Sequence, residues 1–208
     1  VGIAHFLKAT EDKTRTHAWW PMVERALDFV LTLQKPDGTV SWAAEAVDTG
    51  EDDALLAGNA SILKSLECGL FLSDVYGVVK PDWMAARSTL LNALRTTPER
   101  FDQRKTGARF AMDWYYPVLA GVYDETESAE RLEQSWSKFV IDSHGCRCVS
   151  NEPWVTVAET AELVLALLSA NKRALAETLL QTTLEIRDKN GVFWIGHQIE
   201  ETIYWTRQ

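Results

Sequence analysis

The segment Asp113-Trp-Tyr-Tyr-Pro117 places one carboxylate beside three aromatic rings. A carboxyl group can donate or accept a proton, and aromatic rings stack on sugars or on other apolar rings. We therefore expect Asp113 to be catalytic and Trp114, Tyr115 and Tyr116 to contact a ligand. The structural alternative is that Asp113 caps the start of a helix.

A second acidic pair, Glu159 and Glu162, lies one helical turn apart in a segment that is apolar nearly all round after its first turns. The spacing of Thr156 and Glu159 is that of a capping box, so Glu159 has a structural explanation as well as a possible ligand contact. Glu162 lies beyond the cap in an otherwise apolar setting, where an unpaired carboxylate is costly. We expect it to be the second catalytic residue; the alternative is a salt bridge.

Asp113 and Glu162 together suggest acid/base chemistry, because two carboxylates in different environments can hold different protonation states. Further ring surfaces for the same ligand are expected from Trp42, Trp154 and Trp194. His197 can exchange protons near neutral pH and is expected to contact the ligand as well. It belongs to an aromatic and titratable cluster whose alternative role is loop packing or subunit contact: Trp194, His197, Glu200, Glu201, Tyr204 and Trp205.

The charge of the chain restricts its partners. Thirty acidic and 21 basic residues give a formal charge of -9 over 208 residues, which repels nucleic acid and anionic membranes. The three cysteines do not form a disulfide framework, and the sequence shows neither a signal segment nor an apolar run of the roughly 20 residues that cross a bilayer. These features predict a cytoplasmic protein that does not bind nucleic acid or a membrane.

Helical periodicity dominates the chain. A helix over Pro21 to Gln34 ends at the turn Lys35-Pro-Asp-Gly38, and a second runs from Leu55 to Tyr76. Further helices are expected at about 82–96, 115–124, 128–141, 156–170 and 172–187, whereas alternating strand patterns are scarce. Residues 97–112 are the longest gap.

Two parts of the sequence repeat. Segment 31–42 parallels segment 184–194, since each ends a helix, turns at a glycine and presents a tryptophan. Paired aromatic residues precede both Pro21 and Pro117, and proline suits the first turn of a helix. About three and a half units of two helices each can be counted.

The spacing of Gln34, Gly38 and Trp42 resembles a loose glutamine-tryptophan repeat of terpenoid cyclases and protein prenyltransferase β subunits. Segments 17–21, 112–117, 148–156 and 191–194 resemble uncharacterised bacterial prenyltransferase-like proteins. The resemblance implies an all-α fold of repeated antiparallel helical hairpins, an α/α toroid with a central cavity. Here one domain over 1–208 would form an incomplete toroid, lacking the full ring of six hairpins.

The acidic signatures of cyclases are missing, because there is no Asp-x-Asp-Asp segment and Glu51-Asp-Asp53 lacks the spacing that holds magnesium diphosphate. We interpret that run as a solvated helix entrance. Prenyltransferases hold zinc with Asp, Cys and His, but His144, Cys146 and Cys148 lack an evident fourth ligand. We therefore expect no metal and no cofactor.

The sequence thus favours a protein that binds a small carbohydrate or isoprenoid-like ligand in an aromatic, acidic cavity, with acid/base catalysis left open. The alternative is a non-catalytic scaffold. An incomplete ring would leave apolar ends uncovered, so we also expect a homodimer. The residues at these ends are Ile3, Phe6, Leu7, Ile199, Ile203, Tyr204 and Trp205.

Overall fold

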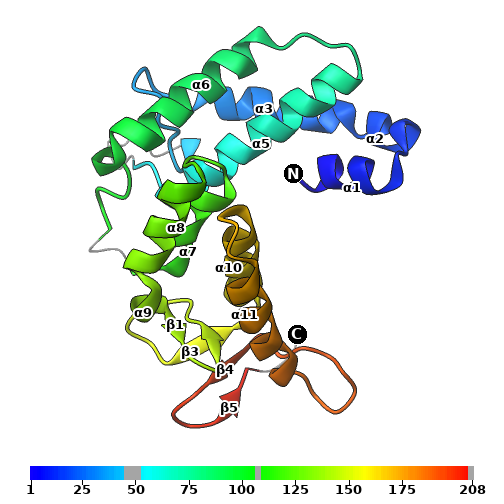
Figure 1. The fold of residues 1–208 in the computed structure, drawn as a ribbon. Helices are drawn as coiled ribbons and strands as arrows, with labels where there is room; N and C mark the ends of the chain where they lie inside the picture. Colours follow the sequence, from blue (N-terminus) through cyan, green and yellow to red (C-terminus); the bar gives the residue numbers. More distant parts are fainter. Residues whose placement is uncertain (45–52, 106–108, 206–208) are drawn as a thin grey trace. The chain divides into compact units, whose positions relative to one another are not determined.

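The computed structural model describes residues 1–44, 53–105 and 109–205, and it divides into two compact units, Val1–Arg104 and Lys105–Gln208 (Figure 1). Helices dominate both units, which confirms the prediction of a mostly helical chain. The short strands were not expected. Whether the helical hairpins build a toroid, and whether the chain is one domain, remain predictions.

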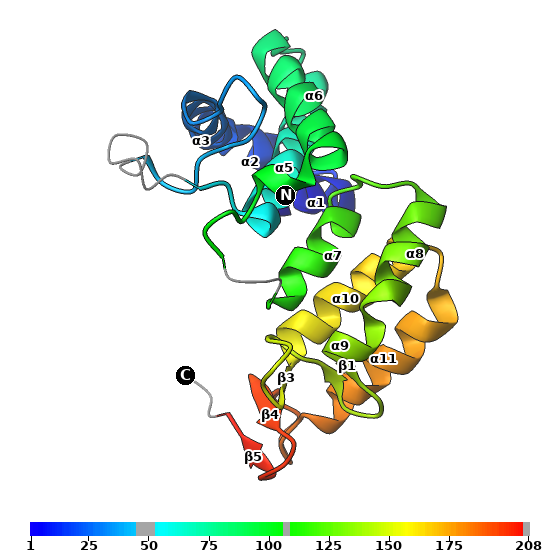
Figure 2. The same ribbon diagram turned by 90° about the vertical axis from the view of Figure 1, so that its left-hand side faces the viewer.

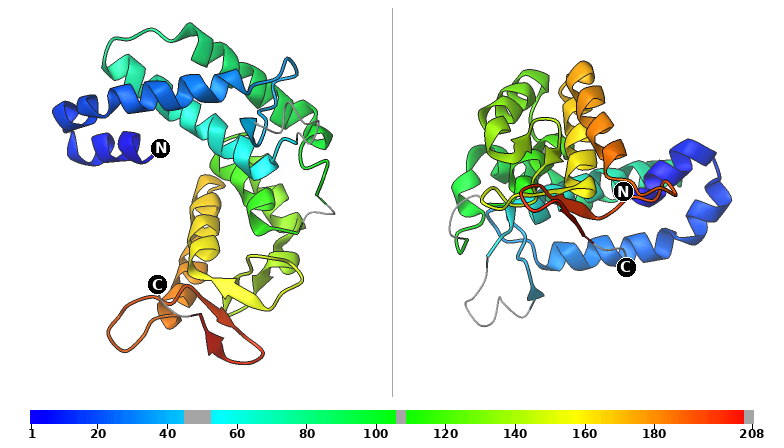
Figure 3. Two further views of the ribbon diagram at one scale, coloured as in Figure 1. Left: turned by 180° about the vertical axis from the view of Figure 1, so that it is seen from behind. Right: turned by 90° about the horizontal axis from the view of Figure 1, so that it is seen from below.

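The first unit consists of α1 (Gly2–Thr10), α2 (Lys13–Ala18), α3 (Trp20–Thr32), α5 (Leu56–Val75), α6 (Pro81–Thr96) and the short 3-10 helix η1 (Pro98–Arg100). Helices α3, α5 and α6 pack against one another (Figure 3). Their contact buries Trp20, Leu63 and Trp83, each no more than 5% exposed. Gly69 makes close packing possible, because a Cβ atom there would lie 2.3 Å from Leu27 Cδ1.

The second unit begins with α7 (Ala111–Leu119), α8 (Glu125–Gln134) and α9 (Trp136–Phe139). A two-stranded sheet of β1 (Val140–Ile141) and β2 (Gly145–Cys146) follows. Helices α10 (Val157–Ser169) and α11 (Arg173–Glu185) form a hairpin and lie side by side (Figure 2). A three-stranded antiparallel sheet joins β3 (Trp154–Thr156), β4 (Gly196–Gln198) and β5 (Ile203–Tyr204).

Several helix boundaries match their sequence signals. Pro21 lies in the first turn of α3, and the Thr156 side chain accepts a hydrogen bond from the Glu159 backbone N–H at the start of α10. The two repeated turns are also alike. In the first turn, Gln34 and Val40 form an isolated antiparallel β-bridge on either side of Gly38 (φ 91°). In the second turn, Arg187 and Phe193 do the same on either side of Gly191 (φ 81°).

The expected helix over 115–124 was placed wrongly. Helix α7 begins at Ala111, so Pro117 lies inside it rather than in its first turn. Proline has no N–H and leaves the carbonyl of the residue four positions earlier without its helical partner. Here the guanidinium Nη2 of Arg131 donates to that carbonyl, Asp113 O, at 2.9 Å. Arg131 Nε donates to Trp114 O at 2.8 Å, so a side chain from α8 stabilises the interrupted helix.

The two apolar ends expected from the sequence differ in how far they are exposed. At the amino-terminal side Leu7 is only 5% exposed, because α1 packs against α5. At the other side Ile203, Tyr204 and Trp205 are 41–51% exposed. The homodimer itself stays a prediction.

No helix in the described ranges has the length and apolar character needed to cross a bilayer.

Candidate acid and aromatic site

The candidate site lies in the second unit, where α7 and α10 contact each other. The Glu162 carboxylate accepts a hydrogen bond from the Tyr115 hydroxyl at 2.6 Å and from the Tyr116 hydroxyl at 3.0 Å. Tyr115 is completely buried, whereas Glu162 and Tyr116 are half-buried. One carboxylate is therefore held by two phenols at the edge of the core, and phenols replace the salt bridge that the sequence left as an alternative.

The two phenols act as donors over the physiological pH range. Burial, the hydrogen bond to Glu162 and the negative charge of that carboxylate raise the pKa of Tyr116 to about 12. The same causes, burial first, raise the pKa of Tyr115 further. Both hydroxyls therefore keep their protons and orient the Glu162 carboxylate.

Glu159, one turn before Glu162, borders the same groups. Its carboxylate accepts a hydrogen bond from the Thr156 hydroxyl. Burial, the charge of Glu159 and a hydrogen bond to its side chain raise the pKa of the Cys148 thiol to about 11. The charge of Glu159 also raises the pKa of Tyr115 and Tyr116. The acid cluster, as we call it below, consists of Tyr115, Tyr116, Cys146, Cys148, Glu159 and Glu162.

The cysteines were missed as neighbours of these acids. Cys146 is fully buried in the core beneath α10, and its backbone N–H donates to the Thr160 hydroxyl at 2.9 Å. Burial, followed by the charge of Glu159, raises the pKa of its thiol. The sequence holds one signal for this proximity: Cys146 and Cys148 are two residues apart, so both thiols lie on the same side of an extended segment. Across the described ranges no three His, Cys, Asp or Glu side chains gather as metal ligands.

Asp113 is 5% exposed, and Lys105 Nζ lies 3.0 Å from each of its carboxylate oxygens. Asp113 is thus held by Lys105, from the segment before α7, whereas Glu162 is held by Tyr115 and Tyr116. The structure therefore places the two predicted catalytic residues in different local networks of one unit. No pattern in the sequence pointed to Lys105.

The predicted aromatic contacts Trp114, Trp154 and Trp194 differ in burial. Trp114 is 5% exposed and stacks on Phe139 at 5.3 Å between ring centroids, so it is a core residue and its placement does not support ligand contact. Trp154 and Trp194 are half-buried and lie 4.9 Å from Trp205 and 5.8 Å from Tyr204, respectively.

His197 stacks on Tyr204 at 4.4 Å between ring centroids, and its buried Nε2 atom has no hydrogen-bond partner among the residues that the structure describes. Burial and the neighbouring His144 lower the pKa of His197. Trp42 belongs to the first unit, where it is 56% exposed. Of the acidic run before α5, Asp53 is buried and accepts hydrogen bonds from the Gln103 and Arg104 backbone. Glu51 and Asp52 lie outside the described residues.

Comparison with known proteins identifies a sugar-processing relative. No protein-family model matches the chain. The chain is 37% identical over 205 residues to the MMP endo-(1,4)-3-O-methyl-alpha-D-mannosidase of Mycolicibacterium hassiacum. The match covers 99% of the chain and 56% of that protein, so the chain spans about half the length of this relative.

This finding corrects the resemblance to terpenoid cyclases and protein prenyltransferases, which is wrong. The spacing of Gln34, Gly38 and Trp42 marks a turn, in which the Gln34 side-chain amide donates to the Gly38 and Ala86 carbonyls at 3.1 and 2.9 Å. Such a turn is a structural feature that unrelated chemistries can share.

Proposed function

We propose that the chain acts as a glycoside hydrolase that cleaves α-(1,4) bonds between 3-O-methylmannose units. The similarity to a mannosidase extends over almost the whole chain and supports this substrate class. A neutral sugar also suits a chain with a formal charge of -9, because such a partner is not repelled.

The observation that carries the proposal is the pairing of Glu162 with the Tyr115 and Tyr116 hydroxyls. Most glycoside hydrolases use two carboxyl groups, one to protonate the leaving oxygen and one to activate water or attack the sugar. Two protonated phenols hold Glu162 in one orientation and leave its remaining lone pairs free to accept a proton from water. We assign Glu162 the role of base.

The second carboxyl group is Glu159 in this proposal. It lies one turn away on α10, is half-buried, and influences the same two phenols. Asp113, the partner expected from the sequence, is contacted through both oxygens by the Lys105 ammonium group. Such a carboxylate is suited to accept rather than donate a proton, so we propose that Asp113 positions α7.

Sugar contacts are available in the same unit. Trp154, Trp194 and His197 are half-buried on or beside the sheet of β3, β4 and β5. Aromatic rings with partly open faces can stack on the apolar face of a pyranose and on its methyl ether. We propose that they bind the substrate next to the acid cluster.

Hydrolysis of a defined oligosaccharide tests this function. The chain is incubated with an α-(1,4)-linked 3-O-methylmannose oligosaccharide, and products are measured by mass spectrometry and by newly formed reducing ends. Glu162→Gln should lower kcat by about 100-fold or more, because proton transfer by a positioned group contributes about 10²–10⁴-fold. Glu177→Gln is the matched control, since the Glu177 side chain is 65% exposed on α11.

The panel also decides the second carboxyl group. Glu159→Gln should lower kcat as much as Glu162→Gln does. Asp113→Asn should lower the free energy of unfolding and have a smaller effect on kcat than these two substitutions. Absence of cleavage by the wild-type chain, or full activity of Glu162→Gln, would contradict the proposal.

A further inference from the structure

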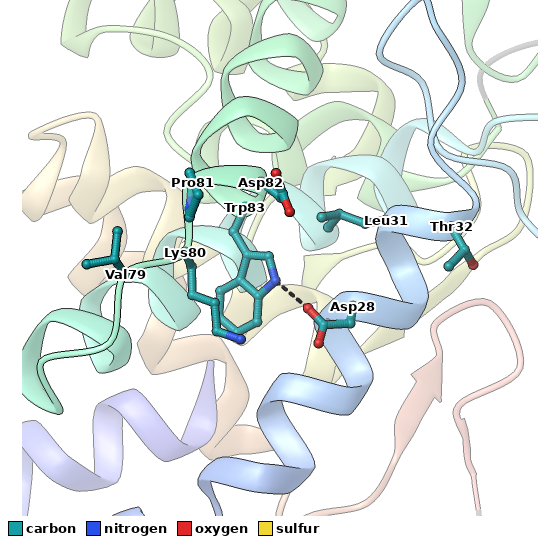
Figure 4. A pocket seen from close by; sticks show the side chains of 8 residues that line it. All are labelled: Asp28, Leu31, Thr32, Val79, Lys80, Pro81, Asp82 and Trp83. Atoms are coloured by element: carbon teal, nitrogen blue, oxygen red, sulfur yellow. Dashed lines mark hydrogen bonds between the residues drawn. The ribbon is translucent and has the colours of Figure 1, made fainter.

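A cavity of about 600 Å³ lies in the first unit, between α3 and residues 79–83, which include the start of α6 (Figure 4). Its volume is in the range of about 300–1,000 Å³ that small-molecule sites occupy. The acid cluster belongs to the second unit, so this cavity is not explained by the proposed catalytic residues.

A buried indole fixes one carboxylate at the cavity. Trp83 is 1% exposed, and its Nε1–H donates to Asp28 Oδ1 at 2.7 Å, as Figure 4 shows. The indole itself cannot move freely, because Trp20 packs at 5.7 Å between ring centroids and Gly69 lies against its far edge. One oxygen of Asp28 is therefore anchored, and the other is available to a ligand.

The charges at the cavity do not cancel. Lys80 is already engaged, with its Nζ 2.8 Å from Glu24 Oε1 and 4.7 Å from the centre of a Trp83 ring. Among the residues that the structure describes, no cationic side chain contacts Asp28 or Asp82. Carboxylates accept hydrogen bonds and donate none, so the cavity repels anions and favours a ligand rich in donors.

The remaining lining combines the apolar side chains of Leu31, Val79 and Pro81 with the polar side chain of Thr32. A ligand that fits both the carboxylates and the apolar side chains must carry several hydroxyl donors together with an apolar face or an alkyl group. A pyranose with a methyl ether has both features. A bare cation would satisfy the carboxylates but leave the apolar lining uncovered.

We infer that this cavity is a second sugar-binding site, which takes a neutral, hydroxyl-rich sugar through Asp28 and Asp82 and its methyl ether through the apolar lining. The inference rests on the proposed function for its choice of a methylated mannose. It adds a place where the first unit holds sugar without cleaving it.

The Trp83 indole N–H gives a direct readout, because it donates to Asp28 at the cavity. Methyl 3-O-methyl-α-D-mannoside is titrated into the ¹⁵N-labelled chain, and the Trp83 indole signal, assigned with Trp83→Phe, is followed by NMR. A saturating shift in the millimolar range is expected. Asp28→Asn and Asp82→Asn should each weaken binding at least about tenfold, since a hydrogen bond to a charged group contributes about that factor.

Asp74→Asn is the matched control, because Asp74 is an exposed carboxylate of α5 outside the cavity. It should bind like the wild type. A wild-type Trp83 signal that does not respond to the sugar, or a response unchanged in Asp28→Asn, overturns the inference. A response to putrescine or Ca²⁺ alone, without one to the sugar, assigns the cavity to a cation and also overturns it.

The two proposals fail in distinguishable ways. Glu162→Gln should lower kcat by about 100-fold or more while the Trp83 response persists, because the two groups belong to separate units. Cleavage without a Trp83 response removes only the second site. A Trp83 response without cleavage removes only the catalytic proposal.

Discussion

Removal of the Tyr115 hydroxyl tests the geometry of the acid cluster most directly. The hydroxyl is in a completely buried side chain and donates to Glu162 at 2.6 Å. A hydrogen bond to a charged group contributes about 1.5–3 kcal/mol, compared with about 0.5–1.5 kcal/mol between neutral groups. Tyr115→Phe should therefore lower the free energy of unfolding by about 2 kcal/mol in the wild-type background.

The same substitution should cost less when Glu162 is neutral. In Glu162→Gln the hydroxyl meets an amide, so Tyr115→Phe should then cost about 1 kcal/mol. Urea unfolding of the four proteins, followed by circular dichroism, gives the coupling free energy as the difference between the two costs. Tyr116→Phe is the comparison, and its longer 3.0 Å bond at a half-buried site should contribute less.

Two results would refute this reasoning. A Tyr115→Phe cost that is equal in both backgrounds would mean that the hydroxyl does not interact with the charge of Glu162. A larger loss of unfolding free energy for Tyr116→Phe than for Tyr115→Phe would also contradict it, because the shorter hydrogen bond of the more buried hydroxyl should contribute more.

Three further predictions concern other residues. Gly38→Ala should destabilise the chain by about 2 kcal/mol or more in thermal unfolding, while Gly191→Ala should cost about 1 kcal/mol. Both glycines have positive φ, but only at Gly38 would a Cβ atom meet a backbone atom, Thr89 O at 2.5 Å, so equal costs would contradict the packing. Stability should fall as pH rises from about 10 to about 12, because the folded chain raises the pKa of Tyr116 above its ordinary value of 10.0 and holds that proton more tightly than the unfolded chain. This contribution is complete below pH 10, and a pH profile unchanged by Tyr116→Phe would argue against it. Glu159→Gln should speed alkylation of Cys148 by iodoacetamide at pH 8.5 several-fold, because it removes the negative charge that, after burial, contributes most to raising the thiol pKa to about 11. Peptide mass spectrometry follows that residue, and a slower reaction would contradict the assigned contact.

The sequence by itself determined the local structure well. Pro21 at the start of α3, Thr156 at the start of α10, and Gly38 and Gly191 in the repeated turns act through backbone geometry and hydrogen bonds over a few residues. Such signals are complete within the segment that carries them. The sequence also drew attention to Glu162, because its neighbours along the helix are apolar; its catalytic role stays a prediction.

Only the tertiary structure decided which partners these residues have. Tyr115 and Glu162 are 47 residues apart, and Asp28 and Trp83 are 55 apart, so no local period relates them. Pro117 lies inside a helix because Arg131, from the next helix, supplies the missing donor. Helical periodicity shows which face of a segment is apolar, but not which other helix will cover that face. Packing makes that choice, and it places the phenols on Glu162 and the indole on Asp28.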